Sequence, residues 1–440
     1  MTLRPLALAL LLACNGDKDG DDGIIPKDAD ADADADADSD ADADADTDTD
    51  TQPALCGRIE PGGAAVDVTP GDDLATVIGQ AAPGAVLALA DGTYAVSAPI
   101  ALRSAITLVG ASGDRDAVVV DGGHAGGDLF QIGASDVTLA HLTLTASAGD
   151  LVRVQPEGAD LTGIVLHDLH LLDAGRTAVR VGGDGDDHWA DDGELSCSRI
   201  ELTNAGRPFV GACQIAGLDA EGARGWTVRD NSVHGLWCTL ATPGPAIRFT
   251  RGSRDVTITR NVVTDSAFGI VAGQTQDQLG RPWPDAAQCS GFPQAIGAVV
   301  TNNLVSAYED DLVDASAGVM YGIMAESSCD VLVAHNSVYA ADVPVASIEL
   351  RYASTTGTVG NNLMSHRLLR LDDAPADETA NVELADPGSW LFPAGNDFHT
   401  APGATWAIDQ GDPALLDRVP VDVDDEPRSD GLPDIGADEL

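Results

Sequence analysis

Three arginines occupy equivalent positions in a short strand pattern that recurs along the chain. Each lies between two apolar residues, in Val152-Arg153-Val154, Val179-Arg180-Val181 and Ile247-Arg248-Phe249. Because side chains alternate between the two faces of a strand, we expect the flanking residues to be buried and the arginines to point outward, on rungs about 4.8 Å apart. Guanidinium groups can bind carboxylate or sulfate groups through two parallel hydrogen bonds. The pattern therefore predicts a row of anion-binding side chains on one face.

The same alternation extends beyond the arginines. The central residues of the successive segments, which we expect to form one outward row, are Gln131, Arg153, Arg180, Gln214, Arg248, Val271, Met324, Glu349 and Arg370. Acidic residues occur near the ends of the same segments: Glu157, Asp184, Asp219, Glu326 and Asp372. Two interpretations follow. Either each arginine pairs with a neighbouring acid and the row neutralises itself, or Arg153, Arg180, Gln214 and Arg248 bind an acidic or sulfated polysaccharide.

An acidic loop follows the second arginine segment. It contains Asp184, Asp186 and Asp187 and continues into His188 and Trp189. Carboxylate oxygens at this density are typical ligands of Ca²⁺ in exported proteins, so Ca²⁺ is the cofactor that the sequence suggests.

A lyase is the alternative function to a binding protein. Ca²⁺ or arginine would neutralise the carboxylate of a uronic-acid polymer, and a base would then remove the C5 proton in a β-elimination. Arg248 and His188 are the candidate catalytic residues. A plain loop position is the competing interpretation of His188. No lysine lies beyond Lys27, so a lysine base is excluded from the rest of the chain.

The chain is strongly acidic. It contains 71 Asp and Glu against 23 Lys and Arg in 440 residues, for a formal net charge of −48. Nucleic acids and anionic lipid surfaces are polyanions that favour clustered basic residues, so they are poor partners for this chain. We expect a monomer that interacts with polysaccharide.

The N-terminus reads as an export signal. Arg4 precedes the apolar run Leu6–Ala13, which is too short to span a bilayer, and Leu11-Leu12-Ala13-Cys14 resembles a bacterial lipobox. That resemblance implies acylation of Cys14 and anchoring at the outer membrane or cell surface by lipid alone. The following alternation of Asp with Ala or Thr up to Thr51 repels itself, so we expect a disordered tether.

Beyond the tether, one pattern recurs at intervals of roughly 30 residues, which is typical of a solenoid. It places Asn or an aliphatic residue between apolar positions, as in Val228-Arg-Asp-Asn231-Ser-Val233. The predicted column is Leu142, Leu169, Ile200, Asn231, Asn261, Asn303, Asn336 and Asn362. Stacked asparagines can bond to one another through their amides, so we expect a structural role for them.

These repeats resemble the right-handed parallel β-helix proteins of the pectate-lyase-like superfamily. The opening is a second match, since Asp73 and the apolar residues Leu74, Val77 and Ile78 predict a helix that caps the first coil. The acidic C-terminal segment 422–439 is similar to the closing segment of many bacterial surface β-helix proteins. The resemblance implies an all-β solenoid, but motifs of pectate lyases, polygalacturonases and pectin methylesterases are missing, so it does not imply their activities.

The sequence therefore predicts four segments: a lipoprotein signal peptide over 1–13, a tether over 14–55, the β-helix over 56–375 and a C-terminal cap over 376–440. The cap contains Trp390, Phe392, Phe398 and Trp406. Six cysteines beyond Cys14 suggest up to three disulfides in an exported protein. They are Cys56, Cys197, Cys213, Cys238, Cys289 and Cys329. Cys238 with Cys289, and Cys197 with Cys213, are the pairings that the spacing suggests, among 15 possibilities for six cysteines.

Overall fold

A computed structural model shows how residues 56–440 fold. The described residues are 56–60, 62, 64–183, 187–239, 241–274, 280–286, 289, 293–315, 317–342, 344–392, 397–428 and 431–440. The predicted signal peptide, Cys14 and the tether lie outside them, as do Asp184 and Asp186.

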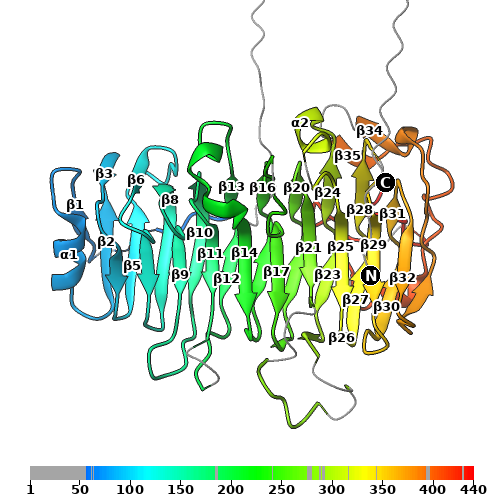
Figure 1. Cartoon of the computed structure of the whole chain (residues 1–440), viewed down its shortest axis with the longest axis horizontal. Helices are drawn as coiled ribbons and strands as arrows, with labels where there is room; N and C mark the ends of the chain where they lie inside the picture. Colours follow the sequence, from blue (N-terminus) through cyan, green and yellow to red (C-terminus); the bar gives the residue numbers. More distant parts are fainter. Residues whose placement is uncertain are drawn as a thin grey trace, which may run out of the picture. The chain divides into compact units, whose positions relative to one another are not determined.

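The described chain winds into coils that stack by parallel strand pairing. A 10-stranded sheet, here called sheet B, takes one strand from each coil, and a 20-stranded sheet A takes most of the others (Figure 1). The short strands β18 (Ser253–Arg254), β22 (Ala295–Ile296) and β26 (Ser328–Cys329) form a three-stranded sheet of their own. Every pairing between successive coils in sheets A and B is parallel, as in β11 with β14 and β14 with β17. The prediction of a right-handed parallel β-helix is confirmed.

The strands form three rows. Sheet B contains β4 (Ile100–Leu102), β7 (Phe130–Ile132), β9 (Val152–Val154), β11 (Thr177–Val181), β14 (Ala216–Glu221), β17 (Ile247–Thr250), β21 (Phe268–Ala272), β25 (Tyr321–Glu326), β29 (Ala346–Arg351) and β32 (Leu368–Leu371). The first row of sheet A contains β1 (Val66–Val68), β2 (Ala85–Leu89), β5 (Ile106–Gly110), β12 (Glu194–Ser196), β15 (Thr227–Arg229), β19 (Thr257–Thr259), β23 (Val299–Thr301), β27 (Val331–Ala334), β30 (Gly357–Gly360) and β33 (Asp377–Thr379). The second row contains β3 (Gly92–Ala95), β6 (Val118–Ala125), β13 (Arg199–Glu201), β16 (Ser232–His234), β20 (Val262–Thr264), β24 (Leu304–Ala307), β28 (Ser337–Ala340) and β31 (Leu363–Met364). The long strands β8 (Val137–Ser147) and β10 (Val165–Leu172) run through both rows.

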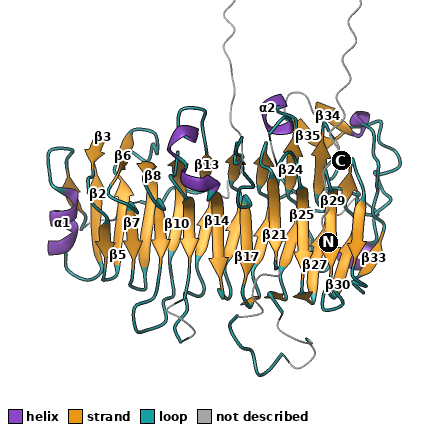
Figure 2. Ribbon diagram, in the orientation of Figure 1, coloured by secondary structure: helices purple, strands orange, loops and turns teal. Residues whose placement is uncertain are grey.

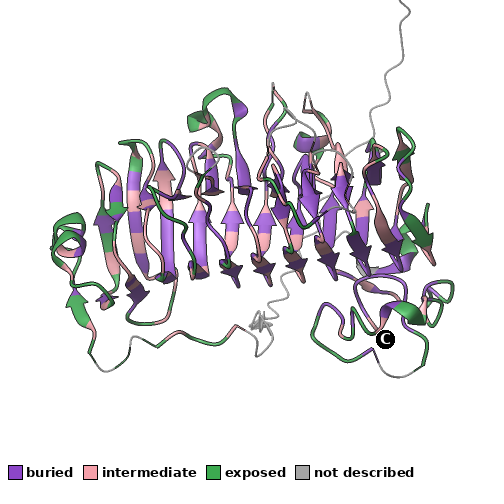
Figure 3. Cartoon of the chain, turned by 90° about the horizontal axis from the view of Figure 1, so that it is seen from below, coloured by how far each residue is buried: buried purple, intermediate pink, exposed green. Residues whose placement is uncertain are grey.

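Stacked aliphatic side chains fill the interior of the coils. On sheet B, the inward residues that pair from coil to coil are Val152, Val179, Leu218, Ile247, Ile270, Ile323 and Ile348. All seven are fully buried, and Figure 3 shows buried residues on the strands along the whole stack, with partly exposed residues between them. The inward positions of the apolar–polar–apolar pattern thus form the core, because strand alternation sends them to one face.

A short helix covers the first coils, as the sequence predicts. Helix α1 (Leu74–Gln80) lies at one end of the stack (Figure 2). The Asp73 side chain accepts a hydrogen bond from the Thr76 amide at 2.9 Å, which caps the helix. Leu74 and Ile78 are buried against the core. A second helix, α2 (Asp310–Val313), lies in a loop between sheets A and B.

Asparagines make a continuous ladder at the corner between the two rows of sheet A. The ladder residues are Asn231, Asn261, Asn303, Asn336, Asn362 and Asn381. Each Nδ2 donates to the Oδ1 of the next residue at 2.9 to 3.0 Å. Their structural role is confirmed, and Asn381 extends the predicted column by one coil. The placement of Ile200 was wrong, because Ile200 pairs with Val233 and the Ser198 amide donates to Asn231.

The residues that precede the ladder turn the chain through left-handed backbone conformations. In successive coils they are His141, Asp168, Cys197, Asp230, Arg260, Asn302, His335 and Asn361, with φ between 48° and 57°. We call this column the corner residues. An N-terminal strap, residues 56–60, crosses one part of it, where the Gly57 carbonyl lies 2.9 Å from His167 Nε2 and the Ile59 amide donates to His141.

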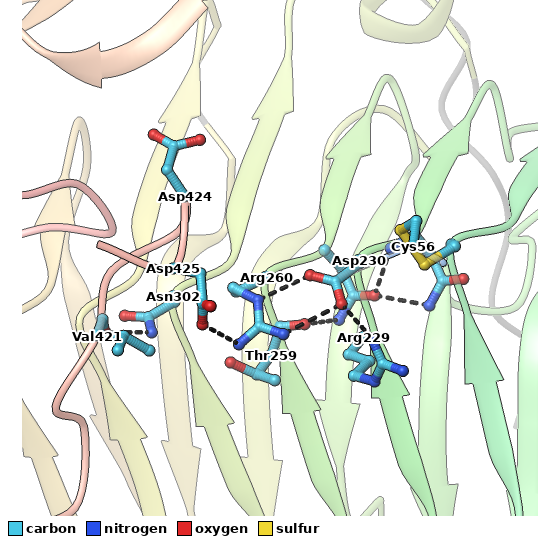
Figure 4. Close-up of polar contacts among 12 residues, drawn as sticks. Cys56, Arg229, Asp230, Thr259, Arg260, Asn302, Val421, Asp424 and Asp425 are labelled. Carbon is cyan, nitrogen blue, oxygen red and sulfur yellow. Dashed lines mark hydrogen bonds and ion pairs between the residues drawn. A yellow bond between two sulfur atoms is a disulfide. The ribbon is translucent and has the colours of Figure 1, made fainter. Parts of the chain in front are cut away.

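The C-terminal tail crosses another part of the corner. Asn302 donates to the Val421 carbonyl at 2.8 Å (Figure 4). Between strap and tail, Asp230 binds Arg229 and Arg260, each with a closest distance of 2.7 Å, and Asp425 reaches Arg260 at 3.7 Å. Both ends of the described chain are thereby fixed against the same corner.

All six cysteines beyond Cys14 form disulfides, which confirms the predicted number. The pairs are Cys56–Cys197, Cys213–Cys238 and Cys289–Cys329. The suggested pairings of Cys238 with Cys289 and of Cys197 with Cys213 were wrong, because partners are set by which coils and loops lie together rather than by spacing in the sequence.

The C-terminal part packs against the last coils. Strands β34 (Trp390–Phe392) and β35 (Asp397–Thr400) form an antiparallel hairpin. Trp390 and Phe398 are buried in a small apolar cluster with Leu363 and Ile435, whereas Trp406 is exposed. The tail thus covers part of sheet A with an apolar layer of its own. None of the helices among the described residues is long and apolar enough to cross a membrane.

Candidate functional site

A group of charged side chains occupies the outward face of sheet B near its middle. Strands β9, β11, β14 and β17, with the two residues on either side of each, contain five arginines and three acids. We call this group the basic patch: Arg153, Arg176, Arg180, Arg248 and Arg251 with Asp150, Asp219 and Glu221. Arginine is in excess here within a chain whose formal net charge is −48.

Asp219 lies between two arginines of the outward row. Its backbone pairs with Arg180 on one side and Arg248 on the other. Its carboxylate accepts hydrogen bonds from Arg180 Nη1 at 2.6 Å and from Arg248 Nε and Nη2 at 2.8 Å. Burial alone would lower the pKa of Arg248, but the hydrogen bonds and charge of Asp219 raise it. Arg248 therefore holds its proton firmly.

Gln214 is not part of the outward row. It ends the 3₁₀ turn η2 (Gly211–Cys213), before β14 begins. The prediction that it forms the rung between Arg180 and Arg248 was wrong, since Asp219 takes that position. The prediction for Arg370 was also shifted by one residue, because Leu369 pairs with Glu349.

The next two arginines make longer ion pairs, and Arg153 Nε also donates a hydrogen bond to Gln155 Oε1 at 2.8 Å. Arg153 Nη1 is 3.5 Å and Arg176 Nε 4.0 Å from the carboxylate of Asp150. Asp150 is fully buried, and burial raises its pKa, although a hydrogen bond from the Thr177 amide opposes this. The side chains of Arg153 and Arg176 are 33% and 40% exposed, so both can reach a ligand outside the face.

The predicted catalytic pair does not share a contact among the described residues. Arg248 lies on β17 and additionally donates to Gln274 at 2.7 Å. His188 lies in the loop after β11, with Nδ1 3.8 Å from Asp160. Of the predicted Ca²⁺ ligands, Asp187 is described and exposed, while Asp184 and Asp186 lie outside the described residues. The Ca²⁺ site stays a prediction.

The far end of the outward row is acidic and buried, which sequence reasoning missed. Glu349 is in the row as predicted, but it is fully buried. Arg351 Nε lies 3.2 Å from Glu349, and its Nη1 lies 3.3 Å from Glu326. The Tyr321 hydroxyl and the Arg351 guanidinium are the polar neighbours of the Glu349 carboxylate. Burial raises the pKa of Glu349, more than the neighbouring Tyr321 hydroxyl and Arg351 lower it.

Replacing Glu349 with glutamine should make stability less sensitive to pH. The pKa of Glu349 is raised in the folded chain, so the folded state holds the proton more tightly than the unfolded state does. The free energy of unfolding therefore falls as the pH rises through the pKa of the folded state. Glu349→Gln should therefore gain stability relative to the unmodified protein as the pH rises above the ordinary glutamate pKa of 4.5. Urea unfolding midpoints at several pH values measure this difference.

The matched control is Glu426→Gln, which changes an exposed carboxyl in the C-terminal tail. Its difference from the unmodified protein should stay nearly constant over the same range. A constant difference for Glu349→Gln as well would show that burial does not raise the pKa of Glu349.

The parallel pairing of strands from successive coils defines the protein's class, which is a parallel β-helix. No protein-family model matches the chain, and no curated protein matches its sequence. Among solved structures, it is similar to pectate lyase Pel9A, with 11% identity over 88% of this chain and 98% of that one and a TM-score of 0.45. An alginate lyase from Paenibacillus sp. str. FPU-7 has 14% identity over 72% and 98% of the chains and a TM-score of 0.41. A mannuronic-acid-specific family 6 lyase from human gut microbiota has 13% identity over 81% and 98% and a TM-score of 0.36.

Proposed function

We propose that this protein binds an acidic or sulfated polysaccharide on the outward face of sheet B. The observation that carries the proposal is the excess of arginine over acid in the basic patch of a strongly acidic chain. If the few basic residues of such an acidic chain were placed at random, each would be expected to lie apart from the others and to be neutralised by nearby acids. Here five arginines share three carboxylates on one face.

The geometry of the patch suits a polymer. Arg153 and Arg180 pair directly between adjacent coils, so their guanidinium groups start from neighbouring rungs about 4.8 Å apart. A polymer with a regularly repeated carboxylate or sulfate can engage several rungs at once, and each further contact becomes intramolecular once the first has formed. Arg248 and Asp219 anchor the patch from one side, while Arg153 and Arg176 remain accessible.

The same contacts favour binding over the lyase alternative. A base that removes the C5 proton must first give up its own proton, and the Asp219 carboxylate stabilises the protonated form of Arg248. In this proposal Arg248 positions Asp219 and, through it, Arg180. Among the described residues, His188 makes no contact with the basic patch.

The test is retention of the purified protein on a panel of immobilised glycans. The panel contains pectate, alginate, chondroitin sulfate and a sulfated algal galactan, with dextran as the neutral control, each with and without Ca²⁺. Absorbance at 235 nm in the same samples reports lyase products. We expect retention on at least one acidic glycan without new absorbance, and at least a tenfold loss of affinity for Arg153→Gln with Arg180→Gln.

The matched control is Arg199→Gln with Arg418→Gln, which makes the same change in net charge away from sheet B. It should keep nearly all of the affinity. Equal losses in the two double variants would mean that net charge and not the patch governs retention, and absence of retention on every acidic glycan would refute the proposal. New absorbance at 235 nm would instead establish the lyase.

We also propose that the protein acts outside the cytoplasm, tethered by lipid on Cys14. The three disulfides support an oxidising compartment. A surface location would give the patch access to extracellular glycans.

A further inference from the structure

Three segments of the C-terminal cap bring potential metal ligands together, away from sheet B. They are His399 at the end of β35, Asp424 in the loop after Val423, and Asp438 near the C-terminus. One ligand atom from each lies within 4.8 Å of the other two, and this is the one such group of three among the described residues. The segments are distant in sequence, so folding of the cap assembles the group.

The imidazole of His399 is oriented as it is in many metal sites. Its Nδ1 lies 2.7 Å from Asp397 Oδ1, and its Nε2 points to Asp424 Oδ2 at 3.0 Å. Histidine ligands commonly donate one ring N–H to a carboxylate, which fixes the ring and directs the other nitrogen to the metal. Asp397 supplies that second carboxylate here.

The two aspartates are also held in place. Asp438 is 5% exposed, and its Oδ2 accepts the Thr400 amide at 2.8 Å. Buried Asp422 accepts amides of both neighbouring segments, from Asp424 at 2.9 Å and Glu439 at 3.2 Å. Asp422 therefore fixes the loop that carries Asp424 and the backbone next to Asp438. These hydrogen bonds to backbone amides set the positions of both proposed ligands.

The group has an excess of negative charge. Three carboxylates, those of Asp397, Asp424 and Asp438, lie near a single imidazole, and Asp422 lies near Asp438.

We propose that His399 Nε2, Asp424 and Asp438 bind a divalent transition-metal ion of the Zn²⁺ class, which cross-links three segments of the C-terminal cap. One imidazole nitrogen with two carboxylates suits Zn²⁺ and its neighbours in the first transition row, whereas Ca²⁺ and Mg²⁺ prefer oxygen ligands throughout. Small side-chain rotations would bring the three atoms to bonding distance, and water would complete the coordination.

Co²⁺ is the probe, because its visible absorption reports the ligands directly. Purified full-length protein stripped with EDTA should bind one Co²⁺ per chain with visible d–d bands, and Zn²⁺ should abolish these bands by displacement. His399→Ala and Asp438→Asn should each lose the bands and at least tenfold in affinity. His366→Ala, which removes a half-buried histidine elsewhere in the chain, is the matched control and should bind normally.

A second readout separates lost binding from lost folding. The thermal unfolding temperature of the unmodified protein and of His366→Ala should rise with added Zn²⁺ and reach a plateau near one equivalent. That of Asp424→Asn should not rise. The Asp424 side chain is half exposed, so this substitution has little effect on packing. Absence of Co²⁺ bands at millimolar metal, or unchanged bands in a folded Asp424→Asn, would overturn the proposal. The result is independent of glycan binding, which involves sheet B.

Discussion

Replacing Asn303 with alanine is expected to lower the free energy of unfolding by at least about 3 kcal/mol. Asn303 is fully buried, and its Nδ2 donates to the Ile258 and Thr301 carbonyls and to Asn336 Oδ1. Its Oδ1 accepts from the backbone and side-chain nitrogens of Asn261 at 3.1 and 3.0 Å. Alanine leaves these partners buried without a bond, and each orphaned group costs about 1–3 kcal/mol.

Urea unfolding followed by circular dichroism measures the loss. Asn204→Ala is the matched control, since Asn204 is exposed and outside the ladder; it should change stability by less than about 0.5 kcal/mol. Similar unfolding midpoints for the two variants would mean that the ladder stabilises the coils no more than a surface side chain does.

Replacing Asp219 with alanine is expected to cost about 3–5 kcal/mol of stability, because it leaves two largely buried guanidinium groups without their shared carboxylate. Asp219 is 2% exposed, and the side chains of Arg180 and Arg248 are 26% and 15% exposed. Changing Arg248 to Met in the same chain should recover part of the loss, since it removes the guanidinium group whose ion pair is with Asp219, whereas Arg180 keeps an ion pair with Glu221 at 2.9 Å.

The comparison is with Asp285→Ala, which breaks an exposed ion pair. Asp285 accepts from Arg254 Nη1 with both oxygens, at 2.8 and 2.9 Å, but its side chain is 67% exposed. Its loss should cost less than about 1 kcal/mol. Equal costs at the two sites would contradict the role assigned to burial, and failure of Arg248→Met to recover any stability would show that unpaired charge is not the cause.

The sequence predicts the coils well because their repeat depends on local rules. Alternation of apolar and polar residues decides which side chains face the core, as at Val179 and Val181. Asparagine is the residue that can bond both within and between coils, and Asp73 caps α1 through its own side chain. Each of these features can be recognised in a few consecutive residues.

Errors arose where a neighbouring coil decides the outcome. Cys213-Gln214-Ile215 imitates the strand pattern, yet two 3₁₀ turns precede β14 and shift the strand to Ala216–Glu221. Ile200 was assigned to the ladder because nothing in its own segment reveals that Ser198 lies beneath Asn231. Disulfide partners likewise depend on how loops of different coils meet.

The basic patch was predicted in part for the same reason. The outward positions of Arg153, Arg180 and Arg248 follow from alternation within each strand. The position of Asp219 between Arg180 and Arg248 could be predicted only from the register of three successive coils. The burial of Glu349 and the convergence of His399, Asp424 and Asp438 depend on contacts between segments far apart in the chain, which no local pattern encodes.

The N-terminal strap determines how mechanical tension enters the molecule. Cys56 is bonded to Cys197, 141 residues further along the chain. A pull on the polypeptide before Cys56, such as drag on a tethered protein, is transmitted through the sulfur–sulfur bond to the coil that contains Cys197. When the opposing load acts beyond Cys197, the coils between the two cysteines form a covalently closed loop that bears none of that tension. Peeling of these coils from the N-terminal end is therefore blocked by the disulfide.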